Sequence, residues 1–245
     1  MNKLVKFSLL VFVASLLLSC DRKSKIEIEG HIDNCTGRYI YFSEVRPDGL
    51  EFIDSARLDG GDFKISLSSS SDDVAARRSS PFFLQITLDN KNYGFTTLAK
   101  NGDLLNVCGD ASSFPKSYSV NGSSEAENMR FLDEHLSLFI DSVVFLNTIY
   151  EDNIESDTIR AQVEAAYLQI VDNHTVFLKN YIESHRNSLS SIAAFYQRYN
   201  SRFFFDEKRE LDILKNIYSS LSEIYKDNEN VDFLKNRIAK VEEAK

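Results

Sequence analysis

The spacing of apolar residues changes once along this chain, near Asn121, and that change limits the fold more than any other feature of the sequence. Before Asn121, apolar and polar residues alternate, as around Ile26, Ile28 and Ile32, which is the period of a half-buried strand. After it, apolar residues recur every three or four positions, the period of an amphipathic helix. The sequence therefore predicts an α+β fold, with an N-terminal antiparallel β-sandwich followed by an α-helical hairpin or bundle.

Turn signals such as Pro47-Asp48-Gly49 and Asn101-Gly102 divide the first half into short strands. One polar segment, residues 68–80, is rich in Ser, Asp and Arg, and we expect it to form a mobile loop. The sandwich domain is expected to span residues 25–122. Its predicted strands begin at Lys25 and continue with Arg38–Glu44, Leu50–Leu58, Asp62–Leu67, Pro81–Asp89, Tyr93–Ala99, Asp103–Cys108 and Tyr118–Val120.

Ser124 and Glu127 have the spacing of a capping box, which predicts the start of a long helix and of a helical domain over residues 123–245. Two helices of roughly 25 to 30 residues each are expected to pair as an antiparallel hairpin, followed by a helix near 190–200 and two more after Asp206. The two predicted facing stripes are Leu132, Leu136, Phe139, Val143, Leu146 and Tyr150, and Val163, Tyr167, Ile170, His174, Phe177 and Tyr181.

The first twenty residues have the pattern of a bacterial lipoprotein signal. Lys3 and Lys6 precede an apolar run, residues 7–18, which is shorter than the roughly 20 residues that cross a bilayer. Cys20 follows directly after Leu-Leu-Ser. We therefore expect a signal peptide over residues 1–19, lipidation of Cys20 and a tether over residues 20–24. The mature protein is expected to be anchored to a membrane of the cell envelope, more readily the outer membrane, and to face the periplasm or the surface.

The charge of the chain argues against nucleic acid as a partner. The formal net charge is −9, and removal of residues 1–19 takes away two lysines and no acid, which leaves −11. A phosphate backbone is repelled by this balance, and no cluster of Lys and Arg with interleaved aromatics offsets it. The expected partners are the membrane, through the lipid anchor, and an envelope protein.

Two cysteines remain after lipidation, Cys35 and Cys108. The envelope is oxidising, so they form either a structural disulfide or two partly buried free thiols, and the sequence does not decide between these alternatives. Neither belongs to a CxxC motif, so their spacing does not predict redox catalysis.

The histidines predict neither a metal site nor a catalytic site. His31, Asp33 and Cys35 follow at intervals of two residues, but a turn begins after Asp33 and two glutamates share the polar face, so we expect no metal there. His174 lies in an apolar helical stripe, where an imidazole packs in a core. We expect no cofactor, because the sequence contains no nucleophile elbow, phosphate loop or metal signature.

Three tripeptides match the Asp-Ser/Thr-aliphatic pattern that some envelope bacteria modify with O-linked glycans. The candidate hydroxyls are those of Ser55, Ser142 and Thr158. Aromatic residues of the first half offer a surface for a small ligand. They are Tyr39, Tyr41, Phe42, Phe82 and Phe83.

The order of these features resembles a family of envelope thiol:disulfide interchange lipoproteins, in which a domain of unknown function and a helical spacer precede a thioredoxin-like domain. The resemblance covers about residues 25–245 and depends on a few segments. They are Ile26–Gly37, Asp54-Ser55-Ala56, Asp62-Phe63-Lys64-Ile65, Asn101-Gly102-Asp103, Val120-Asn121-Gly122-Ser123 and Asn187-Ser188-Leu189-Ser190.

The redox cysteines of that family lie in its thioredoxin-like part, to which nothing in this sequence corresponds, so the resemblance implies no catalytic residue here. The sequence therefore favours a lipid-anchored, non-catalytic module that binds or positions a partner, with a connection to thiol redox traffic. The alternatives are an accessory or separated part of a thiol:disulfide oxidoreductase, and a small-ligand binder.

Overall fold

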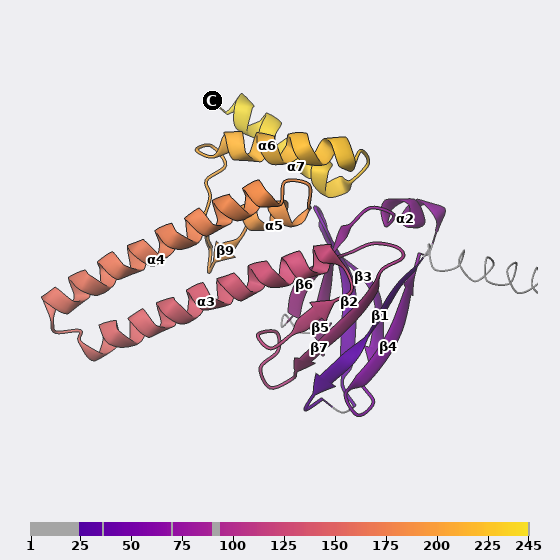
Figure 1. Ribbon diagram of the computed structural model, residues 1–245, viewed down its shortest axis with the longest axis horizontal. Coiled ribbons are helices and arrows are strands. Elements are labelled where there is room, and N and C mark those ends of the chain that lie inside the picture. Colours follow the sequence, from indigo (N-terminus) through magenta and orange to yellow (C-terminus); the bar gives the residue numbers. More distant parts are fainter. Residues whose placement is uncertain (1–24, 36, 70, 90–93, 245) are drawn as a thin grey trace, which may run out of the picture. The chain divides into compact units, whose positions relative to one another are not determined.

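The computed structural model describes residues 25–35, 37–69, 71–89 and 94–244 (Figure 1). The chain divides after Ala126 into two compact units, four residues beyond the expected boundary. Strands fill the first unit and helices dominate the second, so the predicted α+β class is confirmed. The predicted signal peptide, the predicted tether and the predicted lipidation site Cys20 lie outside the described residues.

Two four-stranded sheets form the first unit. The first sheet has the order β4-β1-β7-β8, and the second has the order β3-β2-β5-β6. The strands span β1 (Lys25–Asp33), β2 (Tyr39–Arg46), β3 (Gly49–Arg57), β4 (Asp62–Ser68), β5 (Phe82–Leu88), β6 (Gly94–Ala99), β7 (Leu104–Asp110) and β8 (Ser119–Asn121).

One strand pair departs from the predicted antiparallel pattern. β1 pairs with β7 in parallel, with Gly30 opposite Val107, whereas the other neighbouring pairs among the described strands of this unit are antiparallel. The chain changes sheets between β6 and β7, so the direction of β7 is set by this crossing and not by a hairpin turn. Alternation of apolar residues locates strands, but it carries no information about their direction.

The core of the β unit comes from the inward positions of both sheets, among them Ile26 and Ile28 of β1 and Phe42 of β2, all fully buried. Gly30 is required by close strand contact, since a Cβ at this position would lie 1.7 Å from the carbonyl oxygen of Val107.

The predicted loop over residues 68–80 contains a helix, so the prediction is wrong for residues 72–77. Asp72–Arg77 forms a short helix, α2, whose first turn is capped because the Ser71 hydroxyl accepts a hydrogen bond from the Val74 amide. Arg78, directly after α2, is only 3% exposed and forms an ion pair with the equally buried Glu44 of β2 at 3.0 Å. The composition of this segment indicated solvation, but the ion pairs of Arg77 and Arg78 with Glu44 fix it to the sheet.

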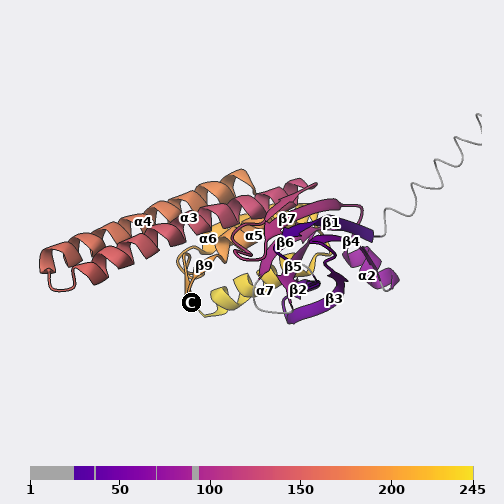
Figure 2. The same ribbon diagram turned by 90° about the horizontal axis from the view of Figure 1, so that it is seen from below.

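The second unit contains the predicted helical hairpin. Its arms are α3 (Ser124–Asp152) and α4 (Asp157–Ser184), which lie side by side in both views (Figures 1 and 2). The cap of α3 is one residue earlier than expected, because it is the Ser123 hydroxyl that accepts a hydrogen bond from the Ala126 amide. The predicted pairing and lengths of the two arms are confirmed.

After the hairpin, the chain is not entirely helical. α5 (Ser190–Phe195) ends earlier than the expected 190–200 helix, and a small β-hairpin follows, β9 (Arg198–Tyr199) with β10 (Arg202–Phe203). Strands of two residues are too short to give a readable period. α6 (Leu211–Ile224) and α7 (Glu229–Glu243) then pair through the predicted stripes.

Candidate binding groove

The facing stripes of α3 and α4 are mostly buried near the start of α3 and the end of α4, which we call the base of the hairpin. They are more exposed near the connection between the two helices, which we call its tip. Leu132 and Phe139 of α3 and His174 and Tyr181 of α4 are buried, whereas Leu146 is half-buried and Tyr150 is exposed. The same sequence pattern therefore forms a packed core at one end of the hairpin and an open space at the other.

Aromatic rings fill the packed end. The rings of His135 and Phe177 stack with centroids 3.8 Å apart. The Phe139 ring meets those of His174, Tyr199 and Phe204 at 4.9, 5.3 and 5.2 Å. Edge-on and stacked contacts of this kind add stability beyond the area that they bury.

His174 is a core residue, as predicted. Its Nε2 lies 2.7 Å from the Gln197 side-chain oxygen, and its ring contacts Phe139 and Phe204. Burial lowers the pKa of His174, a shift that the hydrogen bond with Gln197 opposes. The imidazole is therefore neutral at pH 7 and holds α4 to the segment that leads into β9.

Toward the tip, a cavity of about 780 Å³ opens between α3 and α4, and we call it the hairpin groove. Its wall on α3 carries Val143, Leu146 and Tyr150, at the spacing of one helix face. Tyr167 lines it from α4 and Tyr199 from the small β-hairpin. Its size is within the range of protein binding pockets, and its lining combines tyrosine rings with apolar side chains.

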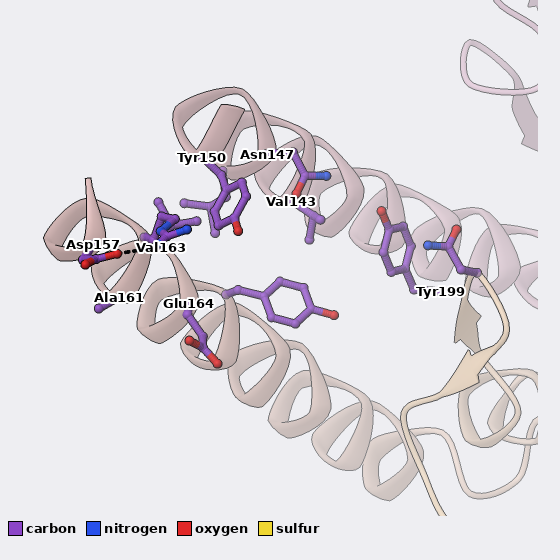
Figure 3. Close-up of a pocket in the computed structure, with 12 residues that line it drawn as sticks. Val143, Asn147, Tyr150, Asp157, Ala161, Val163, Glu164 and Tyr199 are labelled. Atoms are coloured by element: carbon purple, nitrogen blue, oxygen red, sulfur yellow. Dashed lines mark hydrogen bonds and ion pairs between the residues drawn. The ribbon is translucent and has the colours of Figure 1, made fainter. Parts of the chain in front are cut away.

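The side chains around this space come from both arms. Figure 3 shows Val143, Tyr150 and Tyr199 directed toward the space between the helices, with Tyr199 at the end nearer the small β-hairpin, whereas Ala161 and Glu164 lie on the side of α4 away from α3. The labelled α3 residues are Val143, Asn147 and Tyr150, and those of α4 are Asp157, Ala161, Val163 and Glu164.

A smaller cavity of about 180 Å³ adjoins the hairpin groove and shares Tyr167, Tyr199 and Asn200 with it. Asn200 lies in the turn between β9 and β10 with a positive φ of 54°. Asparagine tolerates this left-handed conformation, which lets the tight turn project Tyr199 and Asn200 to the edge of both cavities.

Charged groups of both signs line the groove, and acids predominate. Asp157, Arg160 and Glu164 lie on one face of α4, and Arg160 forms an ion pair with Asp157. The lining therefore contains one arginine and two carboxylates, a net charge of −1, and one of the carboxylates is paired with the arginine.

The two cysteines are free thiols, the second of the alternatives left open by the sequence. Cys35 is buried in the β core, and burial raises the pKa of its thiol. Cys108 of β7 is partly exposed and alternates with the buried Val107, so it lies on the outer face of its sheet. Its thiol donates a hydrogen bond to Asn106 Oδ1 at 3.4 Å.

His31 and Asp33 do not form a metal centre with Cys35. His31 hydrogen-bonds to Asp62 at 2.7 Å and to Asp33 at 3.2 Å on the exposed side of β1, and these bonds raise the pKa of the imidazole. Cys35 turns into the core instead. No three His, Cys, Asp or Glu side chains of the described residues are grouped in a way that suits a metal ion.

The three predicted glycosylation positions lie on different elements. Ser55 is half-buried on β3, and Thr158 is exposed in the first turn of α4. Ser142 lies within α3, where its hydroxyl donates a hydrogen bond to the Leu138 carbonyl at 2.8 Å. Modification at these positions stays a prediction.

The aromatic residues of the first half do not form one surface. Phe42, Phe82 and Phe83 are buried, whereas Tyr39 and Tyr41 point to the other face of β2 from Phe42. The rings of Tyr39 and Tyr41 lie 6.3 Å apart. Most of the proposed small-ligand surface is therefore part of the interior.

Sequence reasoning identified the residues of the hairpin groove but assigned them to a closed interface. Val143, Leu146, Tyr150, Val163 and Tyr167 were all predicted as stripe residues. The residue types gave no signal of an open space, because Leu occurs in the stripe near the tip, as Leu146, and Tyr occurs near the base, as Tyr181.

Within the described part of the chain, no helix has both the length and the apolar character needed to span a bilayer. Comparison with protein-family models, curated proteins and solved structures found no match to this chain.

Proposed function

We propose that this protein is a lipid-anchored component of the bacterial cell envelope that binds a partner protein in the hairpin groove and performs no bond-making chemistry itself. The anchor is the lipidated Cys20, and the expected membrane is the outer one. The observation that carries the binding role is the open groove between two long helices whose facing stripes are not closed near the tip.

The anchor is supported by the sequence of residues 1–20. A positively charged start, a short apolar run and a cysteine after a small residue form the signal of a lipoprotein. Each buried methylene of an acyl chain contributes roughly 0.8 kcal/mol, so several chains on one cysteine hold a protein at a bilayer. A module fixed in this way acts by holding a partner near the membrane.

A binding role is also supported by the apolar side chains that remain exposed on the hairpin. Phe145 and Leu138 of α3 are 65% and 63% exposed, and Leu168 and Val176 of α4 are 57% and 56% exposed. The two side chains of each helix lie seven or eight residues apart, about two helical turns, and therefore on one face, where they are available for contact with another protein.

The geometry of the cysteines disfavours the redox alternative. Thiol:disulfide exchange requires an accessible thiol of low pKa beside a resolving thiol. Cys35 is buried with a raised pKa, and Cys108 lies on the outer face of a sheet. The resemblance to envelope thiol:disulfide interchange lipoproteins stays a prediction, and a partner in thiol redox traffic is compatible with it.

The anchor is tested by metabolic labelling with a palmitate analogue. The wild-type protein should take up the label and fractionate with membranes, and Cys20→Ala should do neither. Equal labelling of the two proteins would exclude the lipid anchor.

The binding role is tested by cross-linking in living cells. A photoreactive amino acid at position 164, in the groove, should cross-link to a discrete envelope protein. The same substitution at Glu223, an exposed position of α6, is the matched control and should not. Absence of any product that distinguishes position 164 from position 223 would contradict a partner in the groove.

A further inference from the structure

The smaller cavity beside the hairpin groove, which we call the turn cavity, has about the size of one aromatic ring with a short chain. Its volume is about 180 Å³. An enclosed apolar cavity of about 150 Å³ is large enough to hold benzene. The hairpin groove, at about 780 Å³, is more than four times as large. The turn cavity therefore suits a small molecule or a single side chain, and not a helix of another protein.

Aromatic rings form most of the wall of the turn cavity. The rings of Phe139 and Phe204 lie edge to face, with centroids 5.2 Å apart and planes at 85°. The Tyr199 ring meets the Phe139 ring at 76°. Tyr167 and Val171 of α4 also line the space. Rings at steep angles to one another present both faces and edges, and a further planar ring packs well against such a wall.

The charged side chain in the described lining of this cavity is that of Arg202 in β10. Arg202 lies directly opposite Tyr199 in the ladder of β9 and β10, so both side chains project from the same face of this small hairpin. That face is directed toward α3, because the Tyr199 ring packs on Phe139. The Arg202 side chain therefore leaves the backbone on the cavity side of the hairpin.

Arg202 differs from the arginines that line the other two cavities. Arg160 of the hairpin groove is paired with Asp157. Arg237 lines a third cavity, of about 430 Å³, and two of its nitrogen atoms bond to Glu207. Among the residues that the structure describes, the Arg202 side chain has no ion pair and no hydrogen bond. Its charge is therefore available to an anion.

Two further polar side chains lie at the same edge of the turn cavity. They are Asn200 and Ser201, the residues of the turn between β9 and β10. The amide of Asn200 and the hydroxyl of Ser201 can each donate a hydrogen bond. The cavity thus has an aromatic interior and an edge that carries donors and one positive charge.

From this combination we infer that the turn cavity binds an aromatic carboxylate, that is, one aromatic ring joined by a short chain to a carboxylate. The ring packs against Phe139 and Phe204. The carboxylate pairs with Arg202, whose planar guanidinium matches its geometry, and accepts hydrogen bonds from the turn. The inference goes beyond the proposed function, because it does not need a partner in the hairpin groove.

The lining also argues against other ligands. Aromatic faces attract ammonium groups, but here such a group would lie beside the like charge of Arg202, with no carboxylate in the described lining to offset it. Asp172 follows Val171 in the sequence but lines none of the described cavities. At roughly 0.15 M salt, exposed charges more than about 8 Å away are largely screened, so the acidic surface of the hairpin does not exclude an anion.

The inference is tested with 3-phenylpropanoate, in which two methylenes separate a phenyl ring from a carboxylate. An NMR titration of the isotopically labelled full chain at roughly 0.15 M salt should give a Kd below about 1 mM, and should shift the signals of residues 199–202. Two controls remove one half of the ligand each. The neutral 3-phenylpropanamide and the ring-free propanoate should both bind at least about fivefold more weakly.

The same chemistry occurs at the end of a protein chain whose last residue is Phe. A short peptide that ends in Phe, with its C-terminal amide as control, distinguishes this source from a free acid. Tighter binding of the peptide acid than of 3-phenylpropanoate would support the C-terminus of a partner as the natural ligand. Weaker binding would support a free aromatic acid.

Variants of the protein locate the site. Arg202→Gln should weaken the binding of 3-phenylpropanoate at least about fivefold and leave that of 3-phenylpropanamide unchanged. Arg198→Gln makes the same change of charge on the same small hairpin and should alter binding by less than about twofold, because Arg198 projects from the opposite face to Tyr199 and lines none of the described cavities. Val171→Phe fills the turn cavity and should abolish binding. Circular dichroism of each variant confirms that the helices are intact.

Several results would overturn the inference. They are equal binding of 3-phenylpropanoate and its amide, equal weakening by Arg202→Gln and Arg198→Gln, unchanged binding in a folded Val171→Phe variant, and no binding of either 3-phenylpropanoate or the peptide acid. Cross-linking at position 164 is measured without these ligands. Failure of the titration would therefore reject the aromatic carboxylate and leave the proposed partner in the hairpin groove in place.

Discussion

Replacement of Glu44 by alanine is expected to destabilise the β unit by about 3–5 kcal/mol, because it leaves the buried Arg78 guanidinium without its carboxylate partner. Glu44 and Arg78 are 2% and 3% exposed, and the Arg78 Nε and Nη2 atoms both lie 3.0 Å from Glu44 Oε2. The ring of Phe82, 5.3 Å from the guanidinium carbon, stays in place, but a cation–π contact contributes only about 2 kcal/mol even when desolvated.

The expected loss is a large part of the roughly 5–15 kcal/mol that stabilises a typical domain. It is measured by urea unfolding of the whole chain, with hydrogen exchange of β2 and α2 to assign the transition to the β unit. Because the pair fixes α2 to the sheet, exchange in residues 72–78 should increase more than exchange in β5.

Two further variants separate the ion pair from a general effect of charge. Glu29 of β1, which pairs with Lys64 at 2.7 Å on the exposed side of the sheet, is the matched control, and Glu29→Ala should lower the stability by only about 0–1 kcal/mol. The double variant Glu44→Leu with Arg78→Met should recover most of the loss, since the buried Arg78 cation is removed together with its partner and Arg77 keeps its ion pair with Glu51. A loss below about 1 kcal/mol in Glu44→Ala, or a double variant as unstable as the single one, would refute this reasoning.

Three other changes have defined outcomes. Gly30→Ala should lower the free energy of unfolding by roughly 3 kcal/mol in urea titrations, since its Cβ meets the Val107 carbonyl, whereas Gly109→Ala, with its nearest neighbour at 3.4 Å, should have a much smaller effect. Burial lowers the pKa of His174, so below about pH 6.5 the unfolded state binds more protons than the folded state. The contribution of His174 to the free energy of unfolding is therefore full above about pH 6.5 and declines below it. The variant His174→Gln should make the thermal stability depend less on pH between about pH 7 and pH 5. An aromatic disulfide reagent should modify Cys108 in the folded protein and reach Cys35 only on unfolding; rapid modification of both would contradict the burial of Cys35.

The strands and helices of this protein were predictable wherever the period of apolar residues was long enough to read. Val231, Leu234, Ile238 and Val241 are all buried in α7, as their spacing predicts. The predicted strand Asp62–Leu67 differs from β4 by one residue. Each of these elements is stabilised by one apolar face, and the spacing of apolar residues in the sequence predicts that face directly.

Elements fixed by a single long-range contact were not predictable. The ordering of residues 72–78 depends on the contacts of Arg77 and Arg78 with Glu44, 33 and 34 residues away along the chain, and composition alone gave the wrong answer there. The parallel pairing of β1 with β7 depends on the path of the chain between sheets. The groove was missed for a related reason, because a repeating stripe shows which residues face a partner helix and not how closely the two helices approach.

The place of β1 in its sheet has a mechanical consequence for a protein held by its N-terminal end. β1 begins at Lys25 and is hydrogen-bonded along both edges, to β4 and to β7. A force applied at the N-terminal end of β1 acts along this central strand, at right angles to its antiparallel hydrogen bonds with β4. Many of these hydrogen bonds must therefore break at the same time. Under the proposed lipid anchor at Cys20, tension from the membrane is therefore carried in shear by both pairings of β1, and not by a single hairpin whose hydrogen bonds open one after another.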